Sequence, residues 1–395
     1  MPGVLEGIKV VDFGRYIAGP FCGALLGDLG ADVVRVEKLD GSEDRWVTPV
    51  GKNGEGTTFL QMNRNKRGMT LDPMTPKGRE VAERLIKWAD VVVANLPHVQ
   101  LQQMGLDYDT ISKINPRIIL AMTSTFGSTG PYKDRVGFDT VGQAMSGSMY
   151  LTGDGSVPMR VAVPVVDYGT AMLNTIGIMA ALMDRQKTGK GQLVETALLR
   201  TALNYANTHL IEQALIQANR GPITNRGWTA GPQDCFKTRD GYIYALCIGN
   251  PLFRRWARLM GDEEKWTKDP RFKDDLARGD NGEILSAAMQ EWCNTRTTAE
   301  VLEALAKARI PAGPVYTPQQ ALDDRHVNEA GFFEHVDYPG LPKAAPTVKP
   351  PVVLSRTPAE IRRRPPVLGE HTDEMMQALG YSATEIAELR DAKVI

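Results

Sequence analysis

The sequence predicts an α/β protein in which a parallel sheet is covered by helices on both faces. Short apolar segments rich in β-branched residues recur through the first half of the chain, and none of them alternates between apolar and polar residues. Segments with a helical pattern lie between them. Such alternation of strands and helices is typical of a parallel sheet buried on both faces.

The expected elements follow one another closely. We expect strands at 8–13, 32–37, 69–71, 91–95 and 118–123, and helices at 20–29, 76–88 and 107–114. Ligands of parallel sheets bind at the carboxyl ends of the strands. Polar residues gather there: Arg15 and Tyr16 after the first strand, Lys38 after the second and Asn95 after the fourth. A cationic rim of this kind favours a phosphorylated ligand.

The segment NRNKRG, residues 63–68, adds Arg64, Lys66 and Arg67 just before the third expected strand. It fits the same rim, and a solvated basic loop explains it equally well. A dinucleotide dehydrogenase would share the architecture. The first strand, however, leads into GRYIAGPFCG, which lacks GxGxxG spacing, and none of the eleven tyrosines has a lysine four residues later.

Composition limits the classes of function. The 395 residues, 42% of them hydrophobic, suffice for two domains, and a net charge of −1 gives no indication of a nucleic-acid or membrane partner. No signal-peptide pattern and no apolar run of about 18 residues is present. Four widely separated cysteines predict reduced thiols in a cytoplasmic protein without a metal site: Cys22, Cys235, Cys247 and Cys293.

Residues 161–192 contain an acid at the start of a long helix, whose apolar residues fall on nearly every side and predict burial all round. Pro164 keeps the apolar run before it out of a helix, and Asp167 stands where the helical pattern begins. Aspartate is among the best N-cap residues, so a purely structural role explains Asp167. The alternative is catalytic, because a carboxylate with an ordinary pKa near 3.9 is ionised at neutral pH and can attack an activated acyl group.

The second half predicts a smaller α+β domain. A linker helix and loop occupy 201–226, and a hairpin at 236–248 turns at 239–241. Helical patterns follow at 251–260, 283–293 and 298–308, so we place the small domain at 227–324. Proline-rich loops then return through 325–395 to two short helical patterns at 372–379 and 383–392.

Taken together, several ordered segments resemble the family III CoA-transferases, which include formyl-CoA:oxalate and carnitine CoA-transferases. The matching stretches span nearly the whole chain: GIKVVDFGRYIAGPFCGALLGDLGADVVRVEK, NRNKRGMTLD, VVVAN, GSTGPY, the segment of Asp167 through TGKGQ, DGYI, IPAGPV and PPVLGEHT. The resemblance implies a Rossmann-like large domain built from both chain ends, 1–200 and 325–395. It further implies an inserted small domain and a homodimer of two interlocked chains.

The family's nucleophilic aspartate matches Asp167. The implied mechanism passes through an aspartyl anhydride and an aspartyl-CoA thioester. Coenzyme A (CoA) is then a substrate, and no tightly bound cofactor is implied. Because water would hydrolyse each intermediate, the site must be shielded. Gly249, in CIGNP, is a candidate for a mobile shielding loop, and a plain turn after a strand is the alternative.

The positions that match the family's CoA contacts are Ile17, Ala18, Lys38, Leu71, Asp72, Met74, Asn95, Leu96, Pro97 and Arg135. The resemblance implies backbone approach to the pantetheine at Ile17 and Ala18, and phosphate binding at Lys38 and Arg135. Formyl-CoA transferases carry glutamine at the position of Ile17 and arginine at that of Gln103. Formate and oxalate are therefore not the expected substrates.

Arg15, Tyr16 and Arg226 are polar groups that can reach a second carboxylate, which favours a dicarboxylate donor such as succinyl-CoA. The α-methylacyl-CoA racemase branch is an alternative, but its catalytic histidine in GHD corresponds to Phe138 in GFD, and its glutamate to Asn250. A CoA-binding protein without turnover is a third possibility. The presence of Asp167 favours an enzyme.

Overall fold

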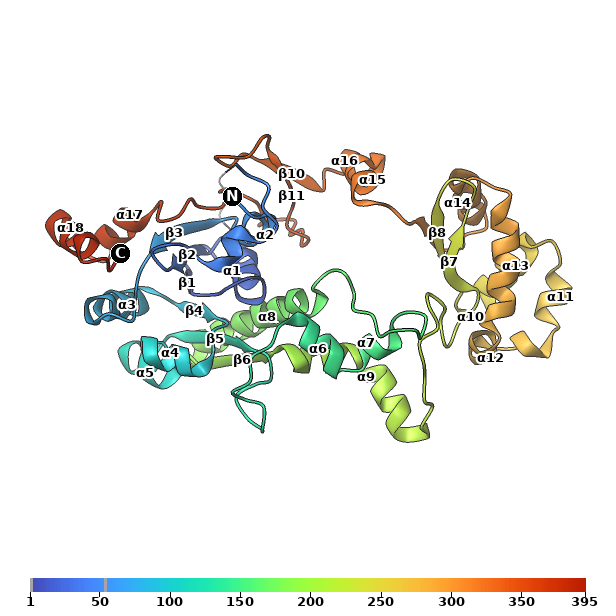
Figure 1. Ribbon diagram of the computed structural model, residues 1–395, viewed down its shortest axis with the longest axis horizontal. Coiled ribbons are helices and arrows are strands. Elements are labelled where there is room, and N and C mark those ends of the chain that lie inside the picture. Colours follow the sequence, from blue (N-terminus) through green and yellow to red (C-terminus); the bar gives the residue numbers. More distant parts are fainter. Residues whose placement is uncertain (1–2, 53–54) are drawn as a thin grey trace. The chain divides into compact units, whose positions relative to one another are not determined.

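The computed structural model describes residues 3–52 and 55–395, and contacts divide the chain into two compact units (Figure 1). The large unit comprises Met1–Ser148, Val161–Ile211 and Gly331–Ile395, so both ends of the chain contribute to it. The small unit comprises Met149–Arg160 and Glu212–Ala330. It therefore begins earlier and ends later than the 227–324 expected from sequence, and it includes a segment from the first half.

A six-stranded parallel sheet forms the centre of the large unit, in the order β3-β2-β1-β4-β5-β6. Its strands are β1 (Lys9–Asp12), β2 (Asp32–Glu37), β3 (Lys66–Thr70), β4 (Val91–Ala94), β5 (Ile119–Ser124) and β6 (Leu193–Ala197). The strand order reverses between β1 and β4, and in such sheets ligands bind at the carboxyl ends beside this point.

Two of the strands differ from the prediction. The expected strand at 69–71 overlaps β3, which begins at Lys66 and so takes in the second half of the basic segment. The sixth strand, LVETA, was not predicted, because its glutamate and threonine interrupt the apolar run. It nevertheless pairs with β5 from Leu193 to Ala197.

Helices cover both faces of the sheet, as predicted. The helices of the large unit are α1 (Ala18–Asp28), α2 (Thr57–Met62), α3 (Pro76–Trp88), α4 (His98–Met104), α5 (Tyr108–Ile114), α6 (Asp139–Met145), α7 (Ser148–Leu151), α8 (Val165–Thr188), α9 (Leu198–Ile216), α17 (Thr372–Ala378) and α18 (Ala383–Asp391), with a 3-10 helix at Glu43–Trp46. Of these, α7 straddles the boundary at Ser148, and α9 continues past Ile211 into the small unit.

Alternate residues of each strand face opposite cores. Val11, Val34 and Val92 pack with the apolar residues of α3, α5, α17 and α18. Val10 and Val33 point the other way and pack with α1 and α8. This double burial explains why the strands read as continuous apolar runs.

The helix α8 was expected to be buried all round, but its burial is one-sided. Among the described residues, α8 is the one helix long and apolar enough to cross a membrane by length and composition. Its most apolar window has a mean hydropathy of 1.3, and half of that window is buried. Ala171 and Ile178 are buried in the core that α8 shares with α1, whereas Met172 and Ile176 are exposed. The buried half marks α8 as a core helix of the large unit.

The small unit is α+β. Its sheet is antiparallel in the order β7 (Gln233–Lys237), β8 (Tyr242–Leu246) and β9 (Ala312–Pro314). Its helices are α10 (Gly249–Leu259), α11 (Glu263–Thr267), α12 (Asp275–Asp280), α13 (Gly282–Asn294), α14 (Thr298–Lys307), α15 (Pro318–Asp323) and α16 (Arg325–Glu329), with a 3-10 helix at Pro270–Phe272. The hairpin of β7 and β8 turns where predicted. The core of the small unit contains Trp256, Phe253 and Trp266.

The returning chain closes the large unit against β3. A hairpin of β10 (Phe333–Val336) and β11 (Ala345–Val348) precedes it. The Asn65 backbone N–H donates to the Arg363 carbonyl at 2.9 Å, and the His371 N–H donates to the Gly68 carbonyl at 2.8 Å. His371 Nδ1 in turn accepts from the Gly68 N–H at 3.1 Å. These contacts fix the C-terminal segment to the edge strand of the sheet.

Candidate active site

The basic segment before β3 does not form a phosphate-binding rim, and it is not a solvated loop. Arg64 pairs with Asp28 at 2.7 Å and Lys66 pairs with Asp12 at 2.7 Å, both with almost no exposure. Arg67, which points away from Lys66, pairs with Asp32 and Glu374. Both interpretations were wrong because the segment runs into a strand whose first residue, Lys66, turns into the interior.

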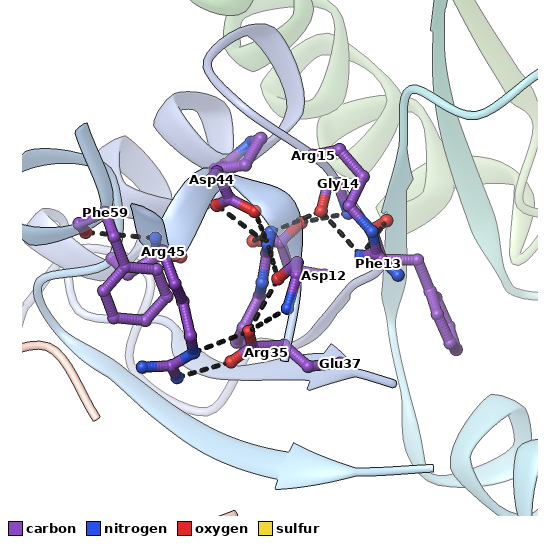
Figure 2. A network of polar contacts seen from close by, with 12 residues as sticks. Asp12, Phe13, Gly14, Arg15, Arg35, Glu37, Asp44, Arg45 and Phe59 are labelled. Atoms are coloured by element: carbon purple, nitrogen blue, oxygen red, sulfur yellow. Dashed lines mark hydrogen bonds and ion pairs between the residues drawn. The ribbon is translucent and has the colours of Figure 1, made fainter. Parts of the chain in front are cut away.

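A network of buried charges surrounds Asp12 at the end of β1 (Figure 2). Besides Lys66, Arg35 lies 3.7 Å from Asp12 and pairs with Asp44 at 3.0 Å. Burial alone would raise the pKa of Asp12, but Lys66 and Arg35 lower it below its usual range. Burial lowers the pKa of Lys66 to about 8, although Asp12 opposes this shift. Charges buried in this way persist only when each has a partner.

The network fixes the loop that follows β1. The Gly14 N–H donates to Asp12 Oδ1 at 2.7 Å, and Arg35 Nη1 donates to the Gly14 carbonyl. Asn95, just after β4, holds the next residue from the other side: the Arg15 N–H donates to Asn95 Oδ1 at 2.6 Å, and Asn95 Nδ2 donates to the Arg15 carbonyl at 2.8 Å. Gly14 and Arg15 thus form a clamped loop at the point where the strand order of the sheet reverses.

A second acid caps the helix that carries Asp167. Asp139, the first residue of α6, is buried, and its Oδ2 accepts the N–H groups of Val166 at 2.7 Å and of Asp167 at 3.0 Å. The residue in the N-cap position of α8 is Pro164, which provides no side-chain cap. The capping interpretation of Asp167 is therefore wrong, because Asp139 satisfies the free N–H groups instead.

The Asp167 carboxylate has an unusual environment. It is partly buried, and no group among residues 3–52 and 55–395 donates a hydrogen bond to its oxygens. Burial, and then the negative charge of Asp139, raise the pKa of Asp167 to about 7. The expectation of an ordinary pKa near 3.9 is thus wrong, and near neutral pH a substantial fraction of Asp167 is protonated.

The clamped loop and the start of α8 meet. Ala18, at the start of α1, packs with Val166, the neighbour of Asp167, in one small apolar cluster. The ring of Tyr16 meets that of Phe138 edge to face, with centroids 5.7 Å apart. The structure therefore brings Tyr16, Ala18 and Asp167 into one neighbourhood.

The remaining positions expected to contact CoA follow the carboxyl ends of the strands: Lys38 after β2, Leu71, Asp72 and Met74 after β3, Asn95, Leu96 and Pro97 after β4, and Arg135 after β5. Parallel strands end at the same edge, so the positions directly after β2, β3 and β4 share one rim, whereas Arg135 lies eleven residues beyond Ser124, the last residue of β5. Lys38 pairs with Glu43 at 2.8 Å, and Arg135 lies over the ring of Tyr132 at 3.9 Å. Leu71 and Leu96 point into the core, so only their backbone can face a ligand.

Two expected residues belong to the small unit. Gly249 is the first residue of α10, and its N–H donates to both carboxylate oxygens of Asp275, at 3.0 and 2.9 Å. Arg226 pairs with Glu283 at 3.0 Å. The shielding role of Gly249 and the contact of Arg226 with substrate stay predictions.

Comparison with known proteins decides the family. The profile described as CoA-transferase family III matches residues 5–372. The chain belongs to CoA-transferase family III. It is 35% identical to the succinyl-CoA–L-malate CoA-transferase beta subunit of Chloroflexus aurantiacus, covering 99% of this chain and 98% of that protein. It is 31% identical to the formyl-CoA:oxalate CoA-transferase of a Bradyrhizobium strain, with coverage of 99% and 97%.

A solved structure supports the fold. The crystal structure of a CAIB/BAIF family protein from Brucella suis matches with a TM-score of 0.83 at 32% identity, covering 96% of this chain and all of that one. Nearly the whole of the given chain of this family III enzyme is therefore matched in sequence and in fold. Its activity as an acyl-CoA:carboxylate CoA-transferase follows from the family and from the named relatives.

Sequence reasoning missed several residues that build this family III site. Asp139 was noted only as part of GFD, and its distance of 28 positions from Asp167 conceals their contact. Asp12 and Lys66 were not linked, since a buried pair between separate strands leaves no local pattern. The signal that was available is an acid inside the first buried strand, where an unpaired carboxylate would be costly.

Lys66→Met should destabilise the protein by about 3 kcal/mol or more, because it leaves buried Asp12 without its closest cation. Arg67→Met, on the same strand, is the matched control and should cost about 1 kcal/mol or less, since Asp32 and Glu374 are more exposed. Urea unfolding measures both. Equal losses in the two variants would show that the Asp12 network contributes no more than a surface ion pair.

Asp167→Asn should stabilise the protein in a way that depends on pH. The folded-state pKa of about 7 exceeds the unfolded value, so wild-type stability falls as pH rises from about 4 to 7, whereas the amide does not titrate. At pH 8 the variant should exceed wild type by up to about 4 kcal/mol in urea unfolding. At pH 4 the gap should vanish.

The control is Asp184→Asn, an exposed acid near the other end of α8. Because this side chain is exposed, its replacement should change the free energy of unfolding by about 0.5 kcal/mol or less at either pH. A gap for Asp167→Asn that is equally independent of pH would contradict the raised pKa of Asp167.

Proposed function

We propose that the chain moves CoA from an acyl-CoA thioester to a free carboxylic acid through covalent intermediates on Asp167. The observation that carries the proposal is the state of this carboxylate. It lies in the first turn of α8 beside the clamped loop, it accepts no hydrogen bond from the described residues, and Asp139 performs the capping that would otherwise occupy it. A carboxylate left free in this way is available as a nucleophile.

The reaction needs four acyl transfers. An oxygen of Asp167 attacks the donor thioester carbonyl, the C–S bond breaks, and CoA thiolate leaves behind an aspartyl anhydride. The thiolate then attacks the aspartyl carbonyl, which releases the donor acid and forms an aspartyl-CoA thioester. The acceptor carboxylate attacks that thioester, the C–S bond breaks, and CoA thiolate leaves as a second anhydride forms. Finally, the thiolate attacks the acceptor's acyl carbon and frees Asp167.

CoA is a substrate in this scheme and enters along the carboxyl rim of the sheet. We assign its phosphates to Lys38 and Arg135, and its pantetheine to the backbone at Ile17 and Ala18. The clamped loop supports this path. It follows β1 at the rim, and Ala18 just after it packs on Val166, the neighbour of Asp167. The proposal includes a cytoplasmic location, where the four free cysteines stay reduced.

We propose a dicarboxylate donor such as succinyl-CoA. Arg15 Nη1 donates to the carbonyls of Phe13 and Gly14, while its Nε and Nη2 have no partner among the described residues. These two groups are suited to bind a second carboxylate in a forked geometry. The relative from Chloroflexus aurantiacus, named for succinyl-CoA and L-malate, supports the same class of substrate.

We also propose that two chains form an interlocked homodimer. The large unit exposes apolar side chains along α8 and α9 that a partner would cover: Met172, Leu173, Ile176, Met183, Leu203, Leu210 and Ile211. Exposed apolar patches of this extent mark interaction surfaces.

Sedimentation should give twice the chain mass of 43.4 kDa.

Two differently tagged dimer preparations should exchange no subunits over days, because interlocked chains separate only after unfolding. Ile176→Asp should weaken assembly by placing a charge in the interface. A monomer at micromolar concentration would overturn the dimer, and subunit exchange within minutes would overturn the interlocking.

The transfer itself is tested by mass spectrometry. After mixing with succinyl-CoA, the peptide that contains Asp167 should carry CoA or a hydroxylamine-trapped adduct, whereas butyryl-CoA, which lacks the second carboxylate, should label it at least about tenfold less. Asp167→Asn should abolish the adduct and reduce exchange by about a thousandfold or more. Asp184→Asn should leave both unchanged.

Three outcomes would overturn the proposal. Exchange that survives in Asp167→Asn would exclude Asp167 as the nucleophile. α-Proton exchange of a methyl-branched acyl-CoA in heavy water, without any adduct, would establish the racemase alternative despite Phe138. Binding of CoA without either reaction would indicate a protein without turnover.

A further inference from the structure

We propose that Asp139 is a positioning residue for the transfer reaction, and that it keeps the Asp167 carboxylate free by occupying the start of α8. This inference rests on the proposed function of Asp167 as nucleophile. Asp139 itself touches no reacting atom in the scheme. It acts through the two backbone N–H groups of α8 and through its charge.

The geometry ties a whole segment together. Oδ2 of Asp139 accepts from Val166 and Asp167, and Oδ1 accepts from the side-chain amide of Gln143, one turn further along α6. Oε1 of Gln143 then accepts the Val161 N–H at 2.9 Å. Asp139 and Gln143 are both buried. The chain from Val161 to Asp167 is therefore held at two points by a single turn of α6.

This arrangement matters because of what a helix start does to an acid. The first N–H groups of a helix lack partners within the helix, and the helix dipole stabilises negative charge there. Asp167 is the third residue of α8 and, without Asp139, its side chain would lie beside those free donors. A carboxylate bound to them would be a more stable anion and a weaker nucleophile.

The charge that raises the pKa of Asp167 is that of Asp139, and the other groups that face Asp167 are uncharged. From α8 itself, the Tyr168 hydroxyl donates to Gln61 of α2 at 3.0 Å, and burial raises the pKa of Tyr168. From α9, the Tyr205 hydroxyl lies against Gly169. The adjoining turn of α1 presents Ala18. Among the described residues, burial and Asp139 are what shift the pKa of Asp167.

The test compares two variants that separate charge from hydrogen bonding. In Asp139→Asn, the amide oxygen can still accept the two N–H groups of α8, but the negative charge is lost. In Asp139→Ala, both are lost. Asp134→Asn, an exposed acid in the loop before α6, is the matched control.

The readout does not depend on turnover. A carbodiimide labels protonated carboxyl groups, so its extent at the Asp167 peptide, followed by mass spectrometry across pH, gives the midpoint of Asp167 ionisation. We expect a midpoint near 7 in wild type and in Asp134→Asn. In Asp139→Asn it should fall by about one unit or more, and in Asp139→Ala further.

The kinetic readout follows on the same variants. The pH profile of kcat/KM should move with the labelling midpoint, and its plateau above pH 8 should fall about tenfold in Asp139→Ala, because the nucleophile is weaker and turned toward the helix start. KM for the acyl-CoA should change far less. A purely structural residue would lower stability without moving either midpoint.

A labelling midpoint unchanged in a folded Asp139→Asn would overturn the inference, and if Asp139→Ala fails to fold, Asp139→Asn alone decides it. A midpoint that falls as expected in a protein whose wild type transfers CoA from no donor would overturn the proposed function while supporting the control of Asp167 by Asp139. The two failures are thus distinguishable.

Discussion

The buried ion pair between Asp12 and Lys66 is the interaction on which the site depends. It joins the end of β1 to the start of β3 across β2, and it excludes water from both charges. Because Asp12 also accepts the Gly14 N–H, the pair determines the direction in which the chain leaves the sheet. A loop held only by its own backbone would fluctuate. Because the loop is hydrogen-bonded to a buried ion pair, which would be costly to break, it forms a rigid side of the site.

Apolar packing links the clamped loop to the turn that carries Asp167, the proposed nucleophile. Ala18 begins α1 directly after the clamped loop and packs on Val166, so the loop and the first turn of α8 cannot move independently. Asp139 approaches the same turn from α6 and sets its backbone. The position of Asp167 is thus determined by three elements, none of which forms a hydrogen bond with its carboxylate.

The sequence reveals the parts of this arrangement that are local. Helix α3 spans 76–88 as predicted, because Thr75 accepts the Gly78 N–H as a cap and Pro76 fits the first turn. The β-branched runs likewise located β2 and β4. Lys66 was misjudged because a lysine in a short basic segment is usually exposed, and only its partner on another strand explains its burial. Asp139 was missed for the same reason: its role exists only after α6 and α8 have met.

For Asp167 as the proposed nucleophile, a pKa of about 7 has a cost and a benefit at neutral pH. Roughly half of the molecules hold Asp167 protonated and inactive, which lowers the rate by a factor of about two. The anion that does form is some three pKa units more basic than an ordinary aspartate, and attack on a thioester gains more from that basicity than the factor lost. Burial alone would supply part of this shift, but it would leave Asp167 beside the donors of its own helix. An acid from a neighbouring helix removes that competition, which explains why the carboxylate can be both buried and free.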